Sequence, residues 1–184
     1  MKLIYSKKDE ENKAISTISR TTSGHGLFHI LDTGCLVLGK TYNIYGKLRI
    51  TSNDGTKPSC NPNSILHTDG CPRASIRAFE HGQRTSQQLN IAHAVVPFSA
   101  GEWNVLHGTF TVDHALDAAD KVLFFVDGVR EGVQIGLDDI KIVPDTESEG
   151  LNCIRNGDFE VGDSRNCKCF IDFYVISDFN LFGI

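Results

Sequence analysis

The chain has 184 residues, of which 40% are hydrophobic and 22% charged, and its formal net charge is −5. These values are ordinary for a globular protein with one sizeable core and a remainder. Acidic and basic residues are interspersed, so the charge gives no reason to expect a nucleic-acid partner. No apolar run approaches the roughly 20 residues that a membrane span needs, so no membrane insertion is expected.

The segment 1–13 is polar and charged, and we expect a frayed end there. Its short apolar start is followed at once by charges, which is unlike the core of a signal peptide. The chain is therefore either cytosolic or a piece of a secreted protein that lacks its true beginning.

Alternating polarity in the first half predicts β-strands at residues 14–20, 27–32 and 41–51. The run 41–51 is the clearest, and it turns two faces in opposite directions. One face belongs to the core and comprises Tyr42, Ile44, Gly46, Leu48 and Ile50. The other carries Tyr45, Lys47 and Arg49 and suits either solvent or a ligand.

A polar loop of about twenty residues follows at 52–72, and loops of that length are usually functional, disulfide-pinned or disordered. Cys60 and Cys71 flank a part of it that has little apolar material. A disulfide between them would remove loop entropy and would indicate an oxidising compartment. The alternative is two exposed thiols. The pairing of the other four cysteines stays open: Cys35, Cys153, Cys167 and Cys169.

The run 74–79 alternates again, with Arg77 and Phe79 on its outer face, and 89–98 predicts another strand. No helical stripe of useful length is present. The segment 113–120 has local helix propensity, but it is short and bridges two strands.

Three further strands are predicted at 103–112, 121–128 and 133–143, the last with the acidic pair Asp138 and Asp139 between apolar flanks. Together these patterns predict an all-β fold, an antiparallel β-sandwich spanning 14–144. An acidic linker follows at 145–152, and the remainder, 153–184, ends in an abruptly apolar tail.

The order of these motifs resembles the carbohydrate-binding modules of family 4/9 type. A Trp opens a W-x-x-x-x-G-x-F strand, here Trp103, Gly108 and Phe110. An apolar strand then ends in Asp127-Gly128, the closing strand carries Leu137-Asp138-Asp139-Ile140, and Gly39 and Tyr42 match a G-x-x-Y strand. The resemblance implies a galactose-binding-like jelly roll with Trp103 and Tyr42 in its core.

The run NGDFEVG at 156–162 resembles the opening of such a module. It implies a tandem array, in which 14–144 lacks its own opening strand and 153–184 is the truncated start of a second module. Since an open sheet edge attracts strands, this run could instead add to the vacant edge of the first module.

Carbohydrate binding would rest on aromatic rings that stack on sugars and on polar neighbours that bind hydroxyl groups. Tyr45 and Phe79 are the stacking candidates on the outer faces, and Lys47, Arg49 and Arg77 are the expected hydrogen-bond donors. The alternative is a solvated outer face, because an exposed aromatic residue on a strand is commonplace.

The resemblance also implies a structural Ca²⁺ ion between the opening and closing strands, with Asp138 as a ligand. Calcium takes six to eight oxygen ligands, so a carboxylate and backbone carbonyls would suit it. The alternative is an acid that caps a turn or meets a cation.

No nucleophile elbow or Gly-rich phosphate loop is present, and we expect no catalytic residue. The resemblance implies a non-catalytic module that binds a polysaccharide, next to neighbouring modules of a larger extracellular or cell-surface protein. Relatives of this family often carry a glycoside hydrolase domain. The alternative is a structural or adhesive repeat that has the sandwich without the sugar affinity.

Overall fold

The computed structural model describes residues 14–17, 20–52, 54–64, 69–80, 87–146, 153–154 and 173–175, the last as backbone alone. Nearly all of these residues lie in strands or in the turns between them. The strands are β1 Ile15–Ser16, β2 Leu27–Leu31, β3 Thr41–Ser52, β4 Arg73–Phe79, β5 Gln87–Ala94, β6 Asn104–Thr111, β7 Lys121–Asp127, β8 Val133–Pro144 and β9 Phe173–Val175. The frayed end predicted at 1–13 and most of the linker and second module predicted after residue 145 lie outside the described residues.

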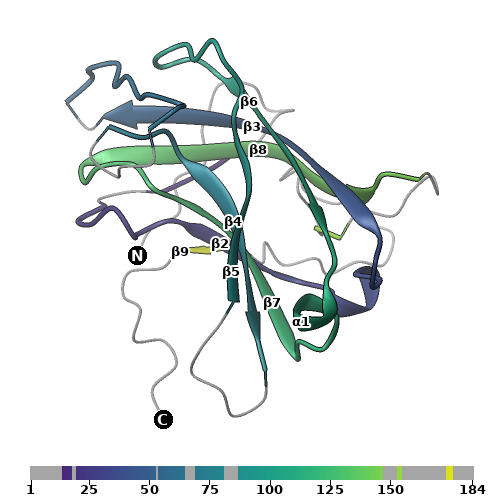
Figure 1. Ribbon diagram of the computed structural model, residues 1–184. Helices are drawn as coiled ribbons and strands as arrows, with labels where there is room; N and C mark the ends of the chain where they lie inside the picture. The colour runs from purple at the N-terminus through teal and green to yellow at the C-terminus, as the bar shows by residue number, and fades with distance from the viewer. Residues whose placement is uncertain are drawn as a thin grey trace, which may run out of the picture.

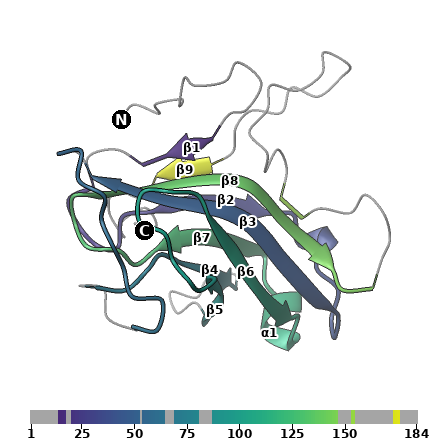
Figure 2. The same cartoon turned by 90° about the horizontal axis from the view of Figure 1, so that it is seen from above.

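The strands pair antiparallel throughout, in the order β1-β8-β3-β6-β5-β4-β7-β2-β9. Only two residue pairs join β5 to β6, and there the sheet folds over into two layers. One layer holds β1, β8, β3 and β6, and the other holds β5, β4, β7, β2 and β9. Figure 1 shows β3 and β8 side by side, with β4, β5 and β7 below them, and Figure 2 gives the view from above. The predicted antiparallel all-β architecture is confirmed.

One hydrophobic core lies between the layers, as the alternation predicts. Its side chains include Ile44, Leu48 and Ile50 from β3 and Ala74, Ile76 and Ala78 from β4. Tyr42 is fully buried, stacks on Phe110 with 5.5 Å between ring centroids, and donates a 2.6 Å hydrogen bond from its hydroxyl to the Cys35 carbonyl. Because that polar group has a partner, the ring adds its apolar surface to the core without an unpaired hydroxyl.

Gly108 lies on β6, where this strand approaches the backbone of β5 closely. A Cβ at this position would collide with the backbone of Ile91 and Ala92 on β5. Only a glycine allows so close an approach of two strands. The close approach of β6 and β5 therefore explains why the W-x-x-x-x-G-x-F pattern has a glycine at this position.

Trp103 does not lie in the core, and the expectation that it would is wrong. It is 36% exposed and precedes β6, whose even-numbered residues point inward. Asn104 is the buried residue instead: its amide nitrogen donates to the carbonyls of Ser99 and Glu102 at 3.0 and 2.8 Å. Because its hydrogen-bond partners lie in the preceding turn, the buried Asn104 side chain fixes the start of β6 to that turn.

Two disulfides brace the fold. Cys60 pairs with Cys71, as predicted, and Cys35 pairs with Cys153 across a sequence separation of 118. Cys153 and Ile154 are both buried in the core between the layers. Cys153 and Ile154 therefore belong to the sandwich formed by the residues before them.

The sheet edge beside β2 is occupied by β9, which pairs antiparallel with Leu27–His29. The run 156–162, predicted as a candidate for a vacant edge, lies outside the described residues.

The described helical structure is short. It consists of a 3-10 turn, η1 Thr33–Cys35, and α1 His114–Asp117, which confirms the local helix propensity at 113–120. Asp113 caps α1 by accepting a 2.9 Å hydrogen bond from the Leu116 N–H. Within the described residues, no helix is long and apolar enough to cross a membrane.

Candidate ligand-binding cavity

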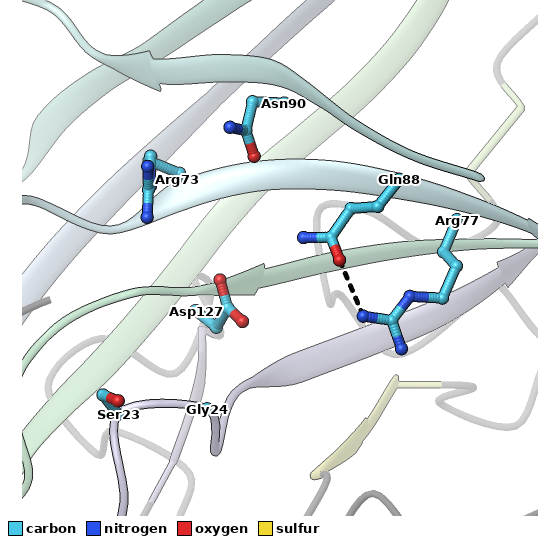
Figure 3. A pocket seen from close by; sticks show the side chains of 7 residues that line it. All are labelled: Ser23, Gly24, Arg73, Arg77, Gln88, Asn90 and Asp127. Carbon is cyan, nitrogen blue, oxygen red and sulfur yellow. Dashed lines mark hydrogen bonds between the residues drawn. The ribbon is translucent and has the colours of Figure 1, made fainter. Parts of the chain in front are cut away.

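A cavity of about 260 Å³ opens on the outer face of the layer that contains β4. The residues that line it come from three neighbouring strands and the loop before β2, and all but the glycine have polar side chains (Figure 3): Ser23, Gly24, Arg73, Arg77, Gln88, Asn90 and Asp127. The strands supply these side chains because alternate residues of β4, β5 and β7 point away from the core. Ligand sites are concave and use a small number of placed polar groups to orient the ligand, and this cavity offers such groups.

Two hydrogen bonds fix side chains around the cavity. Arg77 donates from Nη2 to Gln88 Oε1 at 2.7 Å, and the Ser75 hydroxyl donates to Asn90 Oδ1 at 2.9 Å. In both pairs the partners lie directly opposite each other on β4 and β5. Cross-strand pairs of this kind hold side chains in one orientation before a ligand arrives.

Phe125 lies under the Arg77 guanidinium, whose central carbon is 5.2 Å from the ring centroid. The contact is diagonal, because Arg77 pairs with Leu123 and Phe125 pairs with Ser75 in the register of β4 and β7. Burial lowers the pKa of Arg77, and the charge of Asp127 offsets part of that effect. The guanidinium nevertheless stays charged at neutral pH, and the aromatic face below it stabilises the cation.

Arg20 fixes the loop that forms one wall of the cavity. Its guanidinium is buried and donates to six backbone carbonyls, those of Thr22, Ser23, His25, Val129, Arg130 and Val133, at 2.5 to 3.3 Å. These carbonyls belong to the loop before β2 and to the loop between β7 and β8. Burial lowers the pKa of Arg20 to about 10, against the opposing charge of Asp127. One side chain therefore joins both loops next to the cavity.

The structure separates the residues predicted to bind sugar. Arg77 lines the cavity, and Phe79 is half-buried at the end of the same strand. Tyr45, Lys47 and Arg49 instead lie on β3, on the outer face of the other layer. The two outer faces point away from each other, so the predicted set cannot contact one ligand. The assignment of these residues to sugar binding stays a prediction for each face separately.

The outer side of β3 and β6 carries its own aromatic side chains, and we call it the β3 face: Tyr45, Lys47, Arg49, Trp103, Val105 and His107. Tyr45 is 44% exposed and packs at 5.1 Å against His107. The Arg49 guanidinium lies 4.6 Å from the centroid of Trp103. Apolar and cationic groups therefore lie next to one another on the β3 face.

Asp138 pairs in register with Lys47, next to a β-bulge in which Asp139 and Ile140 of β8 face Gly46 alone on β3. Asp139 has a positive φ of 52°, and its carboxylate pairs with Lys47. Asp138 accepts a 2.9 Å hydrogen bond from the Asp139 N–H, and its carboxylate is 3.9 Å from Lys47 Nζ. The hydrogen bond to Asp139 is the main cause of a raised pKa at Lys47.

The ammonium group of Lys47 therefore meets both carboxylates, which is the contact with a cation expected as the alternative to calcium. Among the described residues no group of three or more His, Cys, Asp or Glu side chains could hold a metal. The calcium ion predicted at Asp138 stays a prediction, and thermal unfolding in CaCl₂ and in EGTA would test it.

Sequence patterns missed most of the cavity. Arg73 is the first residue of β4, and Gln88 lies in a part of β5 that precedes the strand predicted from residue 89. Asn90 and Asp127 carry the right chemistry, but nothing in the sequence shows that β5 and β7 flank β4. Alternation within each strand could have found the outward side chains, whereas strand order could not be read.

No protein-family model matches the sequence, and no curated protein matches it either. Solved structures do match the fold. The CBM22-1 xylan-binding domain of Paenibacillus barcinonensis Xyn10C aligns with a TM-score of 0.55 and 14% identity, over 80% of this chain and 83% of that one.

Two structures from Clostridium thermocellum Xyn10B are also similar. The CBM22-1-GH10 modules of that endo-1,4-beta-D-xylanase, complexed with xylohexaose, align with a TM-score of 0.54 and 15% identity, over 79% of this chain and 25% of theirs. Its C-terminal family 22 carbohydrate binding module aligns with a TM-score of 0.54 and 12% identity, over 83% of both chains. At such identities the likeness shows the fold alone. It confirms the predicted jelly-roll β-sandwich and does not confirm the family 4/9 type.

Proposed function

We propose that this chain is a non-catalytic module that binds a polysaccharide of the xylan type in the cavity on β4. The observation that carries the proposal is a preformed polar cavity on the rigid outer face of a jelly roll, in a fold whose solved neighbours include xylan-binding domains. Sugars present many hydroxyl groups, and the arginine and amide side chains of the cavity offer matching hydrogen bonds.

The binding mechanism needs little movement of the protein. Arg77 is held between Gln88 and the Phe125 ring, and Arg20 fixes the loop that bears Ser23 and Gly24. Side chains that are already ordered lose little conformational entropy when a ligand binds. A pyranose hydroxyl that enters the cavity would therefore meet donors in nearly their final positions.

We also propose an extracellular setting beside a catalytic partner domain. The two disulfides are the kind of cross-link that persists in oxidising compartments. One of the structural neighbours joins a module of this fold to a xylanase catalytic domain. In such a parent protein the module would hold the enzyme at its insoluble substrate and raise the local concentration of cleavable chains.

One observation favours a second candidate, a structural or adhesive repeat. Phe125 is the aromatic ring beneath the cavity, and it is buried under Arg77, so it offers no open face for sugar stacking. The β3 face exposes Tyr45, Trp103 and Val105, which suits contact with another protein surface. A module used in this way would keep the sandwich and show no affinity for polysaccharides.

Affinity gel electrophoresis and calorimetry with soluble xylan test the proposal. Arg77→Ala should weaken binding by about tenfold or more, because a hydrogen bond from a charged group contributes roughly 1.5–3 kcal/mol. Tyr45→Ala, on the opposite layer, is the matched control and should bind like the wild type, with thermal unfolding confirming that both variants fold.

Three outcomes are informative. Loss of binding in Tyr45→Ala alone would place the sugar on the β3 face. An unchanged affinity in Arg77→Ala would remove the cavity from the proposal. If the wild type is retarded by no polysaccharide at all, the structural repeat is the better assignment.

A further inference from the structure

We propose that the cavity on β4 selects a sugar that carries a carboxylate, such as a uronic acid unit attached to the polysaccharide. This inference rests on the proposed function and names the substrate class of the same site. It follows from the hydrogen-bonding character, the charge and the size of the cavity.

The polar groups turned toward the cavity are mainly donors. A guanidinium can only donate, so its 2.7 Å bond to Gln88 requires the amide oxygen of Gln88 to face Arg77 and leaves the amide NH₂ for a ligand. In the 2.9 Å hydrogen bond from the Ser75 hydroxyl, Asn90 Oδ1 is the acceptor, so the NH₂ group of Asn90 is likewise available to a ligand. Figure 3 shows both amides beside the cavity, with the Arg77–Gln88 bond drawn as a dashed line.

Arg73 adds a second guanidinium. It lines the cavity opposite Asp127 in the register of β4 and β7. Among the described residues no hydrogen bond or ion pair engages its side chain. Five N–H groups on a planar fork are therefore available, a geometry that matches a carboxylate with two parallel hydrogen bonds.

The local charge is positive in a chain whose net charge is −5. Arg73 and Arg77 line the cavity with one acid, Asp127. Asp127 also interacts with the buried guanidinium of Arg20, whose pKa its negative charge raises. An excess of cation in a concave, partly buried site attracts an anionic group more strongly than an exposed pair would.

The size of the cavity limits what it can seat. At about 260 Å³ it lies just below the roughly 300–1,000 Å³ of sites that enclose drug-sized ligands. It therefore accommodates one charged sugar unit or side group, while the rest of a polysaccharide chain runs along the sheet. The hydroxyl groups of a neutral pyranose can also accept from these donors, but a carboxylate forms stronger, charge-assisted hydrogen bonds with a guanidinium.

The test compares two forms of one polymer by calorimetry: a xylan that bears glucuronic acid side groups, and the same xylan after chemical reduction of its carboxylates to alcohols. The acidic form should bind about tenfold more tightly or better, the gain typical of a charged hydrogen-bonded pair. Raising the NaCl concentration should weaken binding of the acidic form and leave the reduced form nearly unchanged.

Arg73→Gln should bring the affinities for the two polymers close together, because it removes the guanidinium that would pair with the carboxylate. Lys141→Gln is the matched control, since it removes one positive charge from the exposed surface of the other layer and should keep the preference. If Arg73→Gln fails to fold, the comparison of the two polymers with the wild type still tests the inference.

Equal affinity of the wild type for both polymers would overturn the inference and leave the proposed function standing. If the wild type binds neither the acidic xylan nor the reduced xylan, and binds no neutral polysaccharide, both the proposed function and the inference are wrong.

Discussion

Arg20 is the side chain on which the loops beside the cavity depend most. It is 3% exposed, and six carbonyl oxygens from two loops converge on its guanidinium. Backbone carbonyls in a loop usually find water, and here a single cation replaces that water. The charge spreads over a planar group, which suits partners arranged around it in several directions.

Replacing Arg20 by Met should destabilise the fold by about 3–5 kcal/mol, because the carbonyls around it lose their donor in a buried place. The free energy of unfolding in urea measures the loss. Arg130→Met, at an exposed position of the neighbouring loop, is the control and should cost less than about 0.5 kcal/mol. Equal stability of the Arg20 and Arg130 variants would show that the carbonyls are satisfied without the guanidinium.

The burial of Arg20 could not be predicted. Arginine is almost always exposed, and residues 14–20 indicate only a short strand that ends in a charged residue. The carbonyls that hold Arg20 belong to Val129, Arg130 and Val133 as much as to its own loop. Backbone partners more than a hundred residues away leave no pattern in a sequence.

The bulge in β8 explains how a strand can hold two successive acids on one side. In a regular strand Asp138 and Asp139 would point to opposite faces, and one would enter the core. The extra residue turns both toward Lys47 on β3 and returns Ile140 to the core. The left-handed backbone at Asp139 is a conformation that aspartate tolerates better than most residues.

A matched pair of variants tests the backbone of this bulge. Asp139→Gly should stay within about 1 kcal/mol of the wild type, since glycine adopts a positive φ freely and an exposed ion pair contributes little. Asp139→Val should lose about 1–3 kcal/mol, because a β-branched residue resists that conformation. Urea unfolding of both variants measures the difference, and equal losses would contradict a role for the positive φ.

At the scale of elements, alternation was a good guide inside strands and a poor one at their ends. The apolar residues predicted on the inward face of β3 and of β4 are all in the core, because alternate residues of a strand point to the same side. The prediction for Trp103 was wrong because its core position rested on the resemblance to a family motif. Leu106 and Phe110, both inward, set the phase that turns Trp103 outward.

The site was less predictable than the fold, and the reason lies in the whole molecule. A sandwich has two outer faces, and the sequence does not state which strand joins which layer. Tyr45 and Arg77 each point outward on their own strand, yet β3 and β4 lie in different layers. Local alternation therefore indicates which side chains point outward on each strand, whereas grouping them into one site needs the strand order.

The two disulfides should differ in their effect on stability. In the chain-entropy model a closed loop of about 100 residues contributes about 4.7 kcal/mol and one of about 15 residues about 3 kcal/mol. The Cys35–Cys153 bond spans 118 residues and Cys60–Cys71 spans 11. The double variant Cys35→Ala/Cys153→Ala should therefore lose more stability than Cys60→Ala/Cys71→Ala.

Chemical unfolding of the two double variants provides the measurement. A larger loss from removal of the short loop would contradict the expected order. Such a result would indicate that the Cys60–Cys71 disulfide stabilises the fold by more than the closure entropy of its short loop.

The long disulfide has a further consequence for how the molecule responds to proteolysis. Cys35 and Cys153 enclose most of the described strands, from β3 to β8. A single peptide-bond cut anywhere between these two cysteines leaves fragments that are still covalently joined. A nicked molecule would run as one band on a denaturing gel without reductant and as two bands with it. One cut would therefore not by itself release β4, β5 or β7, which line the cavity, from the rest of the chain.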